Sequence, residues 1–142
     1  MRIYRVEERM VNKMGSNRRK IIYVDDVNFQ LLSIKETLKN RYEIYPAISS
    51  DRMFEILEHV TPELILLDIN MPDVDGYETI ARLKADARYT NIPVVFLTAQ
   101  GSQENIVKAM KLGAVDFLAK PLSIPRLVEC VEHQLCHRRK TG

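Results

Sequence analysis

The chain has 142 residues, 46% of them apolar and 28% charged, with a formal net charge of +2. These values are typical of one globular domain and exclude a disordered or collagen-like chain. The small net charge gives no indication of nucleic-acid binding, and no apolar run approaches the roughly 20 residues that a membrane span requires.

Residues 1–17 precede the first regular pattern and are predicted to be an extension outside the domain. Two interpretations remain open for them: a pairing helix, or a segment without fixed structure. The helical interpretation rests on apolar residues at helical spacing, namely Ile3, Val6, Met10 and Met14. The start of the chain lacks the apolar segment of a secretory signal peptide, so we expect a cytoplasmic protein.

From residue 18 onward, short apolar runs alternate with stretches of helical period, which is the pattern of repeated βα units and a parallel sheet. Five strands are predicted, at residues 21–24, 42–46, 64–68, 94–98 and 114–118. Runs such as LILLD are apolar almost throughout, as expected for strands with helices on both faces. The run YEIYP alternates and is placed at an edge. The predicted fold class is therefore α/β, a doubly wound sheet of five parallel strands.

Apolar stripes between the strands predict the helices. The first two stripes are Val27, Leu31, Ile34 and Leu38, then Met53, Ile56, Leu57 and Val60. Gly113 is predicted to end a helix, and the pair Thr61-Pro62 prevents continuation of another. Residues 18–136 thus form the predicted domain, and the basic residues 137–142 resemble the start of a linker.

Polar side chains stand where four of the five predicted strands end. Asp25 and Asp26 follow the first strand, Asp68 ends the third, Thr98 ends the fourth and Lys120 follows the fifth. Because the carboxyl ends of parallel strands share one edge of the sheet, we expect these side chains to converge. Each one alone could be a helix cap or turn residue, but together they indicate phosphoryl chemistry.

Three neighbouring carboxylates repel one another, by about 4 kcal/mol for a pair at 4 Å and an effective dielectric constant near 20. The predicted cluster therefore needs a cation. Oxygen ligands without histidine or thiol favour magnesium, or manganese, with phosphate oxygens completing the coordination shell.

The motifs around these residues resemble the receiver domains of bacterial two-component response regulators. They are VDD at 24–26, LLDINMPDVDG at 66–76, FLTA at 96–99 and LAKP at 118–121. The resemblance covers about residues 19–135 and implies a flavodoxin-like sheet with strand order 2-1-3-4-5. The phrases RLKADARYTNIPVVFLTA and GAVDFLAKP are similar to receivers attached to cyclic-dinucleotide enzymes.

The resemblance implies a role for each residue at the sheet edge. Asp68 would accept the phosphoryl group, while Lys120 and the Thr98 hydroxyl would contact it. The bond between Lys120 and Pro121 would be a cis peptide, which is the usual geometry in this family. Attack by a carboxylate on a phosphohistidine or a small acyl phosphate gives an aspartyl phosphate, which carries up to about two negative charges.

The resemblance also supplies a metal-ligand set. Asp26, Asp68 and the main-chain carbonyl of Asn70 would coordinate Mg²⁺ directly, and Asp25 would act through a bound water.

The resemblance also implies roles in conformational switching and in dephosphorylation for two further pairs of residues. Thr98 would move toward the phosphoryl group and Phe117 would turn inward, changing the surface of the fourth helix, fifth strand and fifth helix. Asn70 and Gln100 would tune access of the hydrolytic water, and their amides cannot act as strong bases, so self-dephosphorylation is predicted to be slow to moderate.

The expected partners are a sensor histidine kinase or phosphotransfer protein and a downstream effector or attached output domain, of which a cyclic-dinucleotide enzyme is one type. A second copy of the chain could pair through the last helix. Neither nucleic acid nor membrane is an expected partner. The chain is expected to catalyse only its own phosphotransfer and dephosphorylation. The alternative is a receiver-like interaction module that works without phosphorylation.

Three other readings are disfavoured. An aspartate-nucleophile phosphatase needs a second acid two residues after the first, where this chain has Asn70. A flavin phosphate would be repelled by the two acids in YVDDVN. A metal site formed by Cys130, His133 and His137 conflicts with the apolar stripe of the same helix, which is Ile124, Leu127, Val131 and Leu135. Cys130 and Cys136 point too far apart for an easy disulfide and are expected to be reduced.

Overall fold

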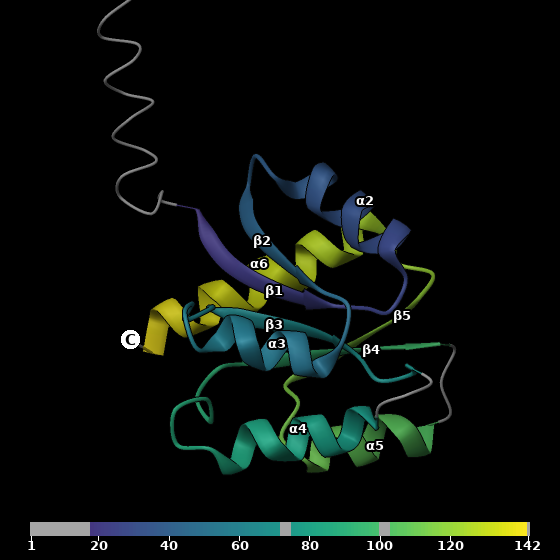
Figure 1. Ribbon diagram of the computed structural model, residues 1–142, viewed down its shortest axis with the longest axis vertical. Helices are drawn as coiled ribbons and strands as arrows, with labels where there is room; N and C mark the ends of the chain where they lie inside the picture. The colour runs from purple at the N-terminus through teal and green to yellow at the C-terminus, as the bar shows by residue number, and fades with distance from the viewer. Residues whose placement is uncertain (1–17, 72–74, 100–102, 142) are drawn as a thin grey trace, which may run out of the picture.

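Five parallel strands form the centre of the computed structural model, which describes residues 18–71, 75–99 and 103–141, with side chains to residue 136. The interpretations of residues 1–17 therefore lie outside the described residues. The strands are β1 (Arg19–Val24), β2 (Tyr42–Ala47), β3 (Leu64–Asp68), β4 (Val94–Ala99) and β5 (Asp116–Lys120). Their order is β2-β1-β3-β4-β5, as predicted, with β2 at an edge (Figure 1).

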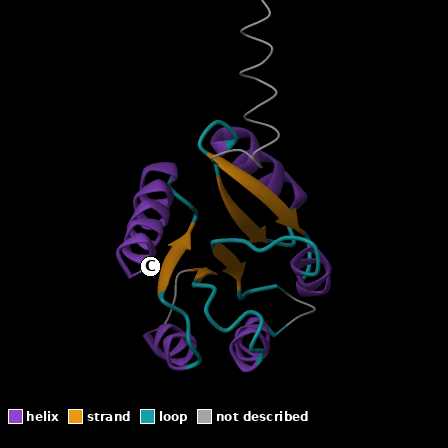
Figure 2. Cartoon of the chain, turned by 90° about the vertical axis from the view of Figure 1, so that its left-hand side faces the viewer, coloured by secondary structure: helices purple, strands orange, loops and turns teal. Residues whose placement is uncertain are grey.

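The described helices cover both faces of this sheet (Figures 1 and 2). They are α2 (Asn28–Leu38), α3 (Ser50–Leu57), α4 (Gly76–Ala85), α5 (Gln103–Lys111) and α6 (Ile124–Thr141). Helices α2 and α6 pack on one face, and α3, α4 and α5 pack on the other. None of these helices is long and apolar enough to cross a membrane.

Side chains of each strand alternate between the two faces. In β1, Ile21 and Tyr23 join the core under α2 and α6, while Ile22 and Val24 join the core under α3, α4 and α5. All residues of β3 are buried, which explains its continuous apolar sequence. The acid that ends this strand, Asp68, pairs with Leu97 of β4, and the residue before it, Leu67, pairs with both β1 and β4.

Two glycines allow close contacts that place the loops. A Cβ on Gly76 would lie 2.5 Å from the Cα of Ile69, so glycine lets α4 begin directly against the segment that leaves β3. Gly113 has a φ of 118° and ends α5, as predicted. The N–H of Ala114 donates to the carbonyl of Ala109 and that of Gly113 to Met110, which is the Schellman arrangement.

Several details of the sequence-based elements were wrong. The first strand begins at Arg19 and not at residue 21, and the fifth ends at Lys120 and not at residue 118. The fifth strand was predicted at residues 114–118 but begins at Asp116, because the N–H of Ala114 closes the end of α5. Val27 was assigned to the buried stripe of the first helix but is 43% exposed, because it precedes α2 as the N-cap residue.

Candidate functional site

Three carboxylates meet at the carboxyl edge of the sheet. Asp25 follows β1 and Asp68 ends β3, and their exposed fractions are 0% and 1%, whereas Asp26 is exposed. One oxygen from each of the three acids lies within 4.8 Å of the others. Within the described ranges this is the one group of three or more potential ligands close enough to share a metal ion. The sequence-based prediction that these acids converge is confirmed.

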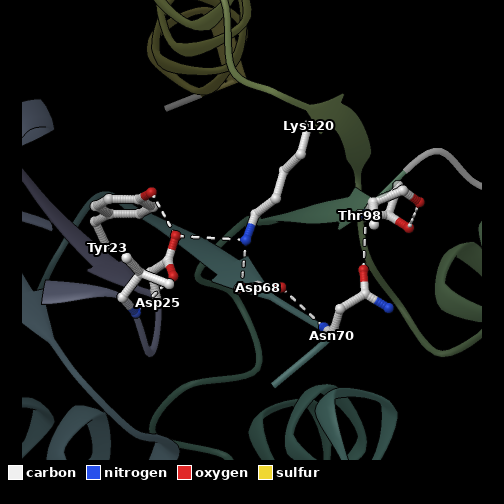
Figure 3. A network of polar contacts seen from close by, with 8 residues as sticks. Tyr23, Asp25, Asp68, Asn70, Thr98 and Lys120 are labelled. Carbon is white, nitrogen blue, oxygen red and sulfur yellow. Dashed lines mark hydrogen bonds and ion pairs between the residues drawn. The ribbon is translucent and has the colours of Figure 1, made fainter. Parts of the chain in front are cut away.

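Lys120 brings a positive charge into this cluster from the end of β5. Its Nζ lies 2.6 Å from Asp68 Oδ2 and 3.5 Å from Asp25 Oδ2 (Figure 3). Burial of Lys120 by itself would lower the pKa of the ammonium group, but the hydrogen bond to Asp68 and the charges of both acids raise that pKa above its ordinary value. The ammonium group therefore stays protonated at neutral pH. The peptide bond between Lys120 and Pro121 is cis, as the resemblance implied.

Asn70 connects the end of β3 with the end of β4. Its main-chain N–H donates to Asp68 Oδ1 over 2.8 Å, and its side-chain Oδ1 accepts from the N–H of Ala99 over 2.7 Å (Figure 3). Both oxygens of Asp68 are thus engaged, one by Lys120 and one by Asn70. The side chain of Asn70 thus ties the segment that leaves β3 to the last residue of β4.

Thr98 and Phe117 lie on neighbouring strands beside this cluster. The Thr98 hydroxyl is buried and donates to the carbonyl of Ala99 over 3.0 Å. Phe117 is half-buried and stacks on Phe96, with ring centroids 5.9 Å apart. Gln100, the other residue assigned to water access, lies outside the described residues.

Tyr23 lies in strand β1, two residues before Asp25. Its hydroxyl donates to Asp25 Oδ2 over 2.8 Å, while the N–H of Val27 donates to Asp25 Oδ1 over 3.0 Å (Figure 3). Burial, together with this hydrogen bond to a carboxylate, raises the pKa of Tyr23 far above its ordinary value. Each carboxylate oxygen of Asp25 therefore accepts a hydrogen bond, Oδ1 from the main chain and Oδ2 from a tyrosine hydroxyl.

The terminal helix does not assemble a metal site from its described residues. Cys130 is buried and its thiol donates to Asp116 Oδ2 over 3.7 Å, whereas His133 is exposed. The side chain of His137 lies outside the described part of the structure. Cys130 and Cys136 are both free thiols.

Sequence reasoning missed two contributions to the site. Tyr23 was counted only as part of an apolar strand, although it stands two residues before Asp25, and an extended chain brings side chains two apart to the same side. That spacing was an available signal. The bond from Asn70 to Ala99 joins residues that are distant in the sequence, and no local pattern could have indicated it.

The fold and the cluster together define a flavodoxin-like α/β domain with an acidic, lysine-bearing edge. The family model for the response regulator receiver domain matches residues 21–132, and the chain belongs to this family. The family works in two-component signalling through Mg²⁺-dependent phosphorylation, and this chain is a receiver domain.

Curated relatives show the same family within longer proteins. A probable cyclic di-GMP phosphodiesterase of Vibrio cholerae is 38% identical over 119 residues, which is 84% of this chain and 27% of that protein. Response regulator Rre1 of Synechocystis is 32% identical over 124 residues, which is 86% of this chain and 53% of that protein. The chain therefore spans about a quarter to a half of these relatives.

A solved structure agrees with the fold. The chemotaxis protein CheY4 of Vibrio cholerae superposes with a TM-score of 0.78 at 24% identity, covering 83% of this chain and 99% of that one. The strand order and the helices on both faces are those of this class of structure.

Proposed function

We propose that Asp68 is the phosphoryl acceptor of this receiver. The observation that carries the proposal is the 2.6 Å contact between Lys120 Nζ and Asp68 Oδ2 inside a cluster of three carboxylates. Asp68 ends a fully buried central strand, so its carboxylate is presented at the sheet edge from a rigid backbone. A fixed nucleophile beside a fixed positive charge suits phosphoryl transfer, in which positioning and electrostatics supply most of the catalysis.

The proposed reaction is a direct transfer to the carboxylate. One oxygen of Asp68 attacks the phosphorus of a phosphohistidine or an acyl phosphate, and the bond from phosphorus to the donor breaks as the new bond forms. The imidazole or carboxylate of the donor leaves with the electron pair of that bond. Lys120 must release Asp68 and pair with the incoming phosphoryl oxygens, which keeps the ammonium group beside the negative charge throughout.

The acid cluster fits a small divalent cation. Asp25, Asp26 and Asp68 provide oxygen ligands within 4.8 Å of one another, and magnesium and manganese favour such ligands. The resemblance adds the main-chain carbonyl of Asn70 to this proposed set and assigns Asp25 to a water-mediated contact. When bound by these acids, Mg²⁺ would supply positive charge that offsets the negative charge of the phosphoryl oxygens and of the carboxylates.

The proposed output of phosphorylation is a change at β5 and its neighbouring helices. Thr98 would turn from the carbonyl of Ala99 toward the phosphoryl group, and Phe117, which already stacks on Phe96, would turn further inward. Phe117 lacks the hydroxyl of a tyrosine, so this coupling relies on packing. The altered surface would be that of α5, β5 and α6. Reversal would be slow to moderate, since the amides of Asn70 and Gln100 are not strong bases.

The proposed donor is a sensor histidine kinase or a phosphotransfer protein. The N-terminal half of α2 adjoins the acids through the contact of Val27 with Asp25, and it presents Phe29 and Leu32 with exposed fractions of 79% and 64%. Exposed apolar side chains beside a reacting group suit a surface that a protein donor covers. The two free thiols favour a cytoplasmic location, where such donors act.

The proposed receiver unit is residues 18–136, followed by a linker start at residues 137–142. The output would be an effector protein or an attached domain, and the Vibrio cholerae relative makes a cyclic-dinucleotide enzyme a specific candidate. A second copy of the chain, paired through α6, is a further candidate partner. The chain itself would catalyse only its own phosphotransfer and dephosphorylation.

Intact-mass spectrometry after incubation with acetyl phosphate and Mg²⁺ tests the proposal. We expect one added phosphoryl group on the wild type and none on Asp68→Asn or in the absence of metal. Asp75→Asn is the matched control, because Asp75 is an exposed acid at the N-cap of α4 and asparagine caps equally well. An adduct on Asp68→Asn would overturn the assignment. A wild type that forms no adduct, even with rapid quenching, would instead favour a phosphorylation-independent interaction module.

A further inference from the structure

We propose that Tyr23 is a positioning residue for the divalent-cation site, because its hydroxyl holds the carboxylate of Asp25 in the orientation that the cation requires. The inference rests on the proposed function of the acid cluster and adds a residue that is not one of its acids. Tyr23 contributes a polar atom to the site from within the buried strand β1.

The contacts of Asp25 show how strongly its orientation depends on Tyr23. Oδ1 accepts from the N–H of Val27 over 3.0 Å, and Oδ2 accepts from the Tyr23 hydroxyl over 2.8 Å. The remaining neighbour of Oδ2 is Lys120 Nζ, at the longer distance of 3.5 Å. The Tyr23 hydroxyl is therefore the closest donor to the inner oxygen of a fully buried carboxylate.

The position of the hydroxyl is itself fixed. Tyr23 is fully buried in the core under α2 and α6, where it packs in the same cluster as Leu31 and Ile34 of α2. A buried tyrosine ring has little freedom to turn, and its hydroxyl needs a partner. Asp25 follows the last residue of β1 and stands two residues after Tyr23, and the ring directs its hydroxyl to that carboxylate (Figure 3).

Removal of the Tyr23 hydroxyl would change which donor sets the orientation of the Asp25 carboxylate. The inner oxygen would lose its neutral donor and retain only the ammonium group of Lys120. Asp25 would then turn toward Lys120, and a tighter pair between them would compete with a cation for the same carboxylate. Loss of an outer partner of a metal ligand typically weakens metal binding by 10–100-fold, and we expect the low end here, about tenfold.

The measurement is a calorimetric titration of the unphosphorylated full chain with Mg²⁺. Tyr23→Phe keeps the ring and removes only the hydroxyl. Tyr42→Phe is the matched control, because Tyr42 is also a buried tyrosine whose hydroxyl donates to a carboxylate, that of Glu132, in a strand-to-helix contact that involves none of the three acids. Thermal unfolding of both variants reports any loss of stability separately.

We expect Tyr23→Phe to raise the Kd for Mg²⁺ about tenfold and Tyr42→Phe to change it by less than about twofold. The phosphorylation rate of Tyr23→Phe with acetyl phosphate should return to the wild-type value at saturating Mg²⁺, since only cation binding is impaired. In an Asp25→Asn background, Tyr23→Phe should add nothing further. Wild-type Mg²⁺ affinity in Tyr23→Phe would overturn the inference and leave the proposed function intact. A wild type that binds no Mg²⁺ would overturn both.

Discussion

Asn70 makes the one described side-chain bond that ties the exit of β3 to the end of β4. Its Oδ1 accepts from the N–H of Ala99 over 2.7 Å, in a pair of exposed residues. A neutral hydrogen bond of this kind contributes about 1 kcal/mol. The bond should therefore restrain the end of β4 without locking it, so that a phosphoryl group on Asp68 could displace it.

We predict that Asn70→Ala frees the N–H of Ala99. Loss of about 1 kcal/mol of local protection should speed its hydrogen exchange roughly five- to tenfold, as measured by nuclear magnetic resonance. The N–H of Val115 should keep its wild-type rate, because it donates to Val94 on the other side of β4. Asn40→Ala, a change at an exposed residue in the turn after α2, is the control. An unchanged rate at Ala99 would show that the bond does not persist in solution.

At the scale of elements, the junction between α4 and α5 is fixed by a lysine and a glycine. Lys84 in α4 donates from its Nζ to the carbonyls of Thr90 and Ile92, over 3.1 and 2.7 Å. Its extended side chain passes Gly113 at the end of α5, where an added Cβ would lie 2.8 Å from Lys84 Cγ. The lysine cannot move aside without breaking its own hydrogen bonds.

We predict that Gly113→Ala lowers the free energy of unfolding by about 1–3 kcal/mol. The substitution combines a positive φ, which is strained for alanine, with the contact against Lys84. Urea unfolding measures the loss. The same substitution in a Lys84→Ala background should cost less, because the clashing atoms are absent and only the backbone strain remains. Equal costs in the two backgrounds would contradict the contact.

The comparison of sequence and structure also belongs to this scale. Strand number was correct because buried parallel strands have a distinctive apolar composition, and the alternating sequence of β2 correctly placed it at an edge. The strand order was correct because the family resemblance implied it. The ends of the elements were less predictable. Strand β5 starts later than expected because the N–H of Ala114 donates to the end of α5. Val27 is the N-cap residue of α2 and not part of its buried stripe. The convergence of the acids followed from topology. The two-residue spacing of Tyr23 and Asp25 was a signal that the sequence analysis did not use. The bond from Asn70 to Ala99 joins residues 29 apart and had no signal in the sequence.

At the scale of the whole molecule, several buried groups hold their protons more tightly than usual. Burial, with the charge of Asp116, raises the pKa of Cys130 from 9.0 to about 12. Burial and a hydrogen bond to Glu43 raise the pKa of Tyr45 from 10.0 to about 12, and Tyr23 and Tyr42 are shifted in the same direction. In the unfolded chain these groups would lose their protons near their ordinary pKa values, 9.0 for the thiol and 10.0 for a tyrosine.

We predict that stability falls as pH rises above about 9. Between the ordinary pKa of Cys130 and its raised value of about 12, the unfolded state binds fewer protons than the folded state, so the free energy of unfolding decreases with pH. One fully differing proton corresponds to about 1.4 kcal/mol per pH unit. Urea unfolding at pH 7.5, 9 and 10 measures the slope, and Cys130→Ala should make it shallower. Identical slopes in the two proteins would contradict a buried, protonated thiol.

The direction of the strands has a consequence for how this domain can be joined to others. All five strands run the same way, so β1 begins and α6 ends at the side of the sheet away from Asp25, Asp68 and Lys120 (Figure 1). A neighbour spliced onto either end would emerge on that far side. The acidic edge would then remain accessible to a phosphoryl donor, so the same domain could be fused to different proteins without a change in its site.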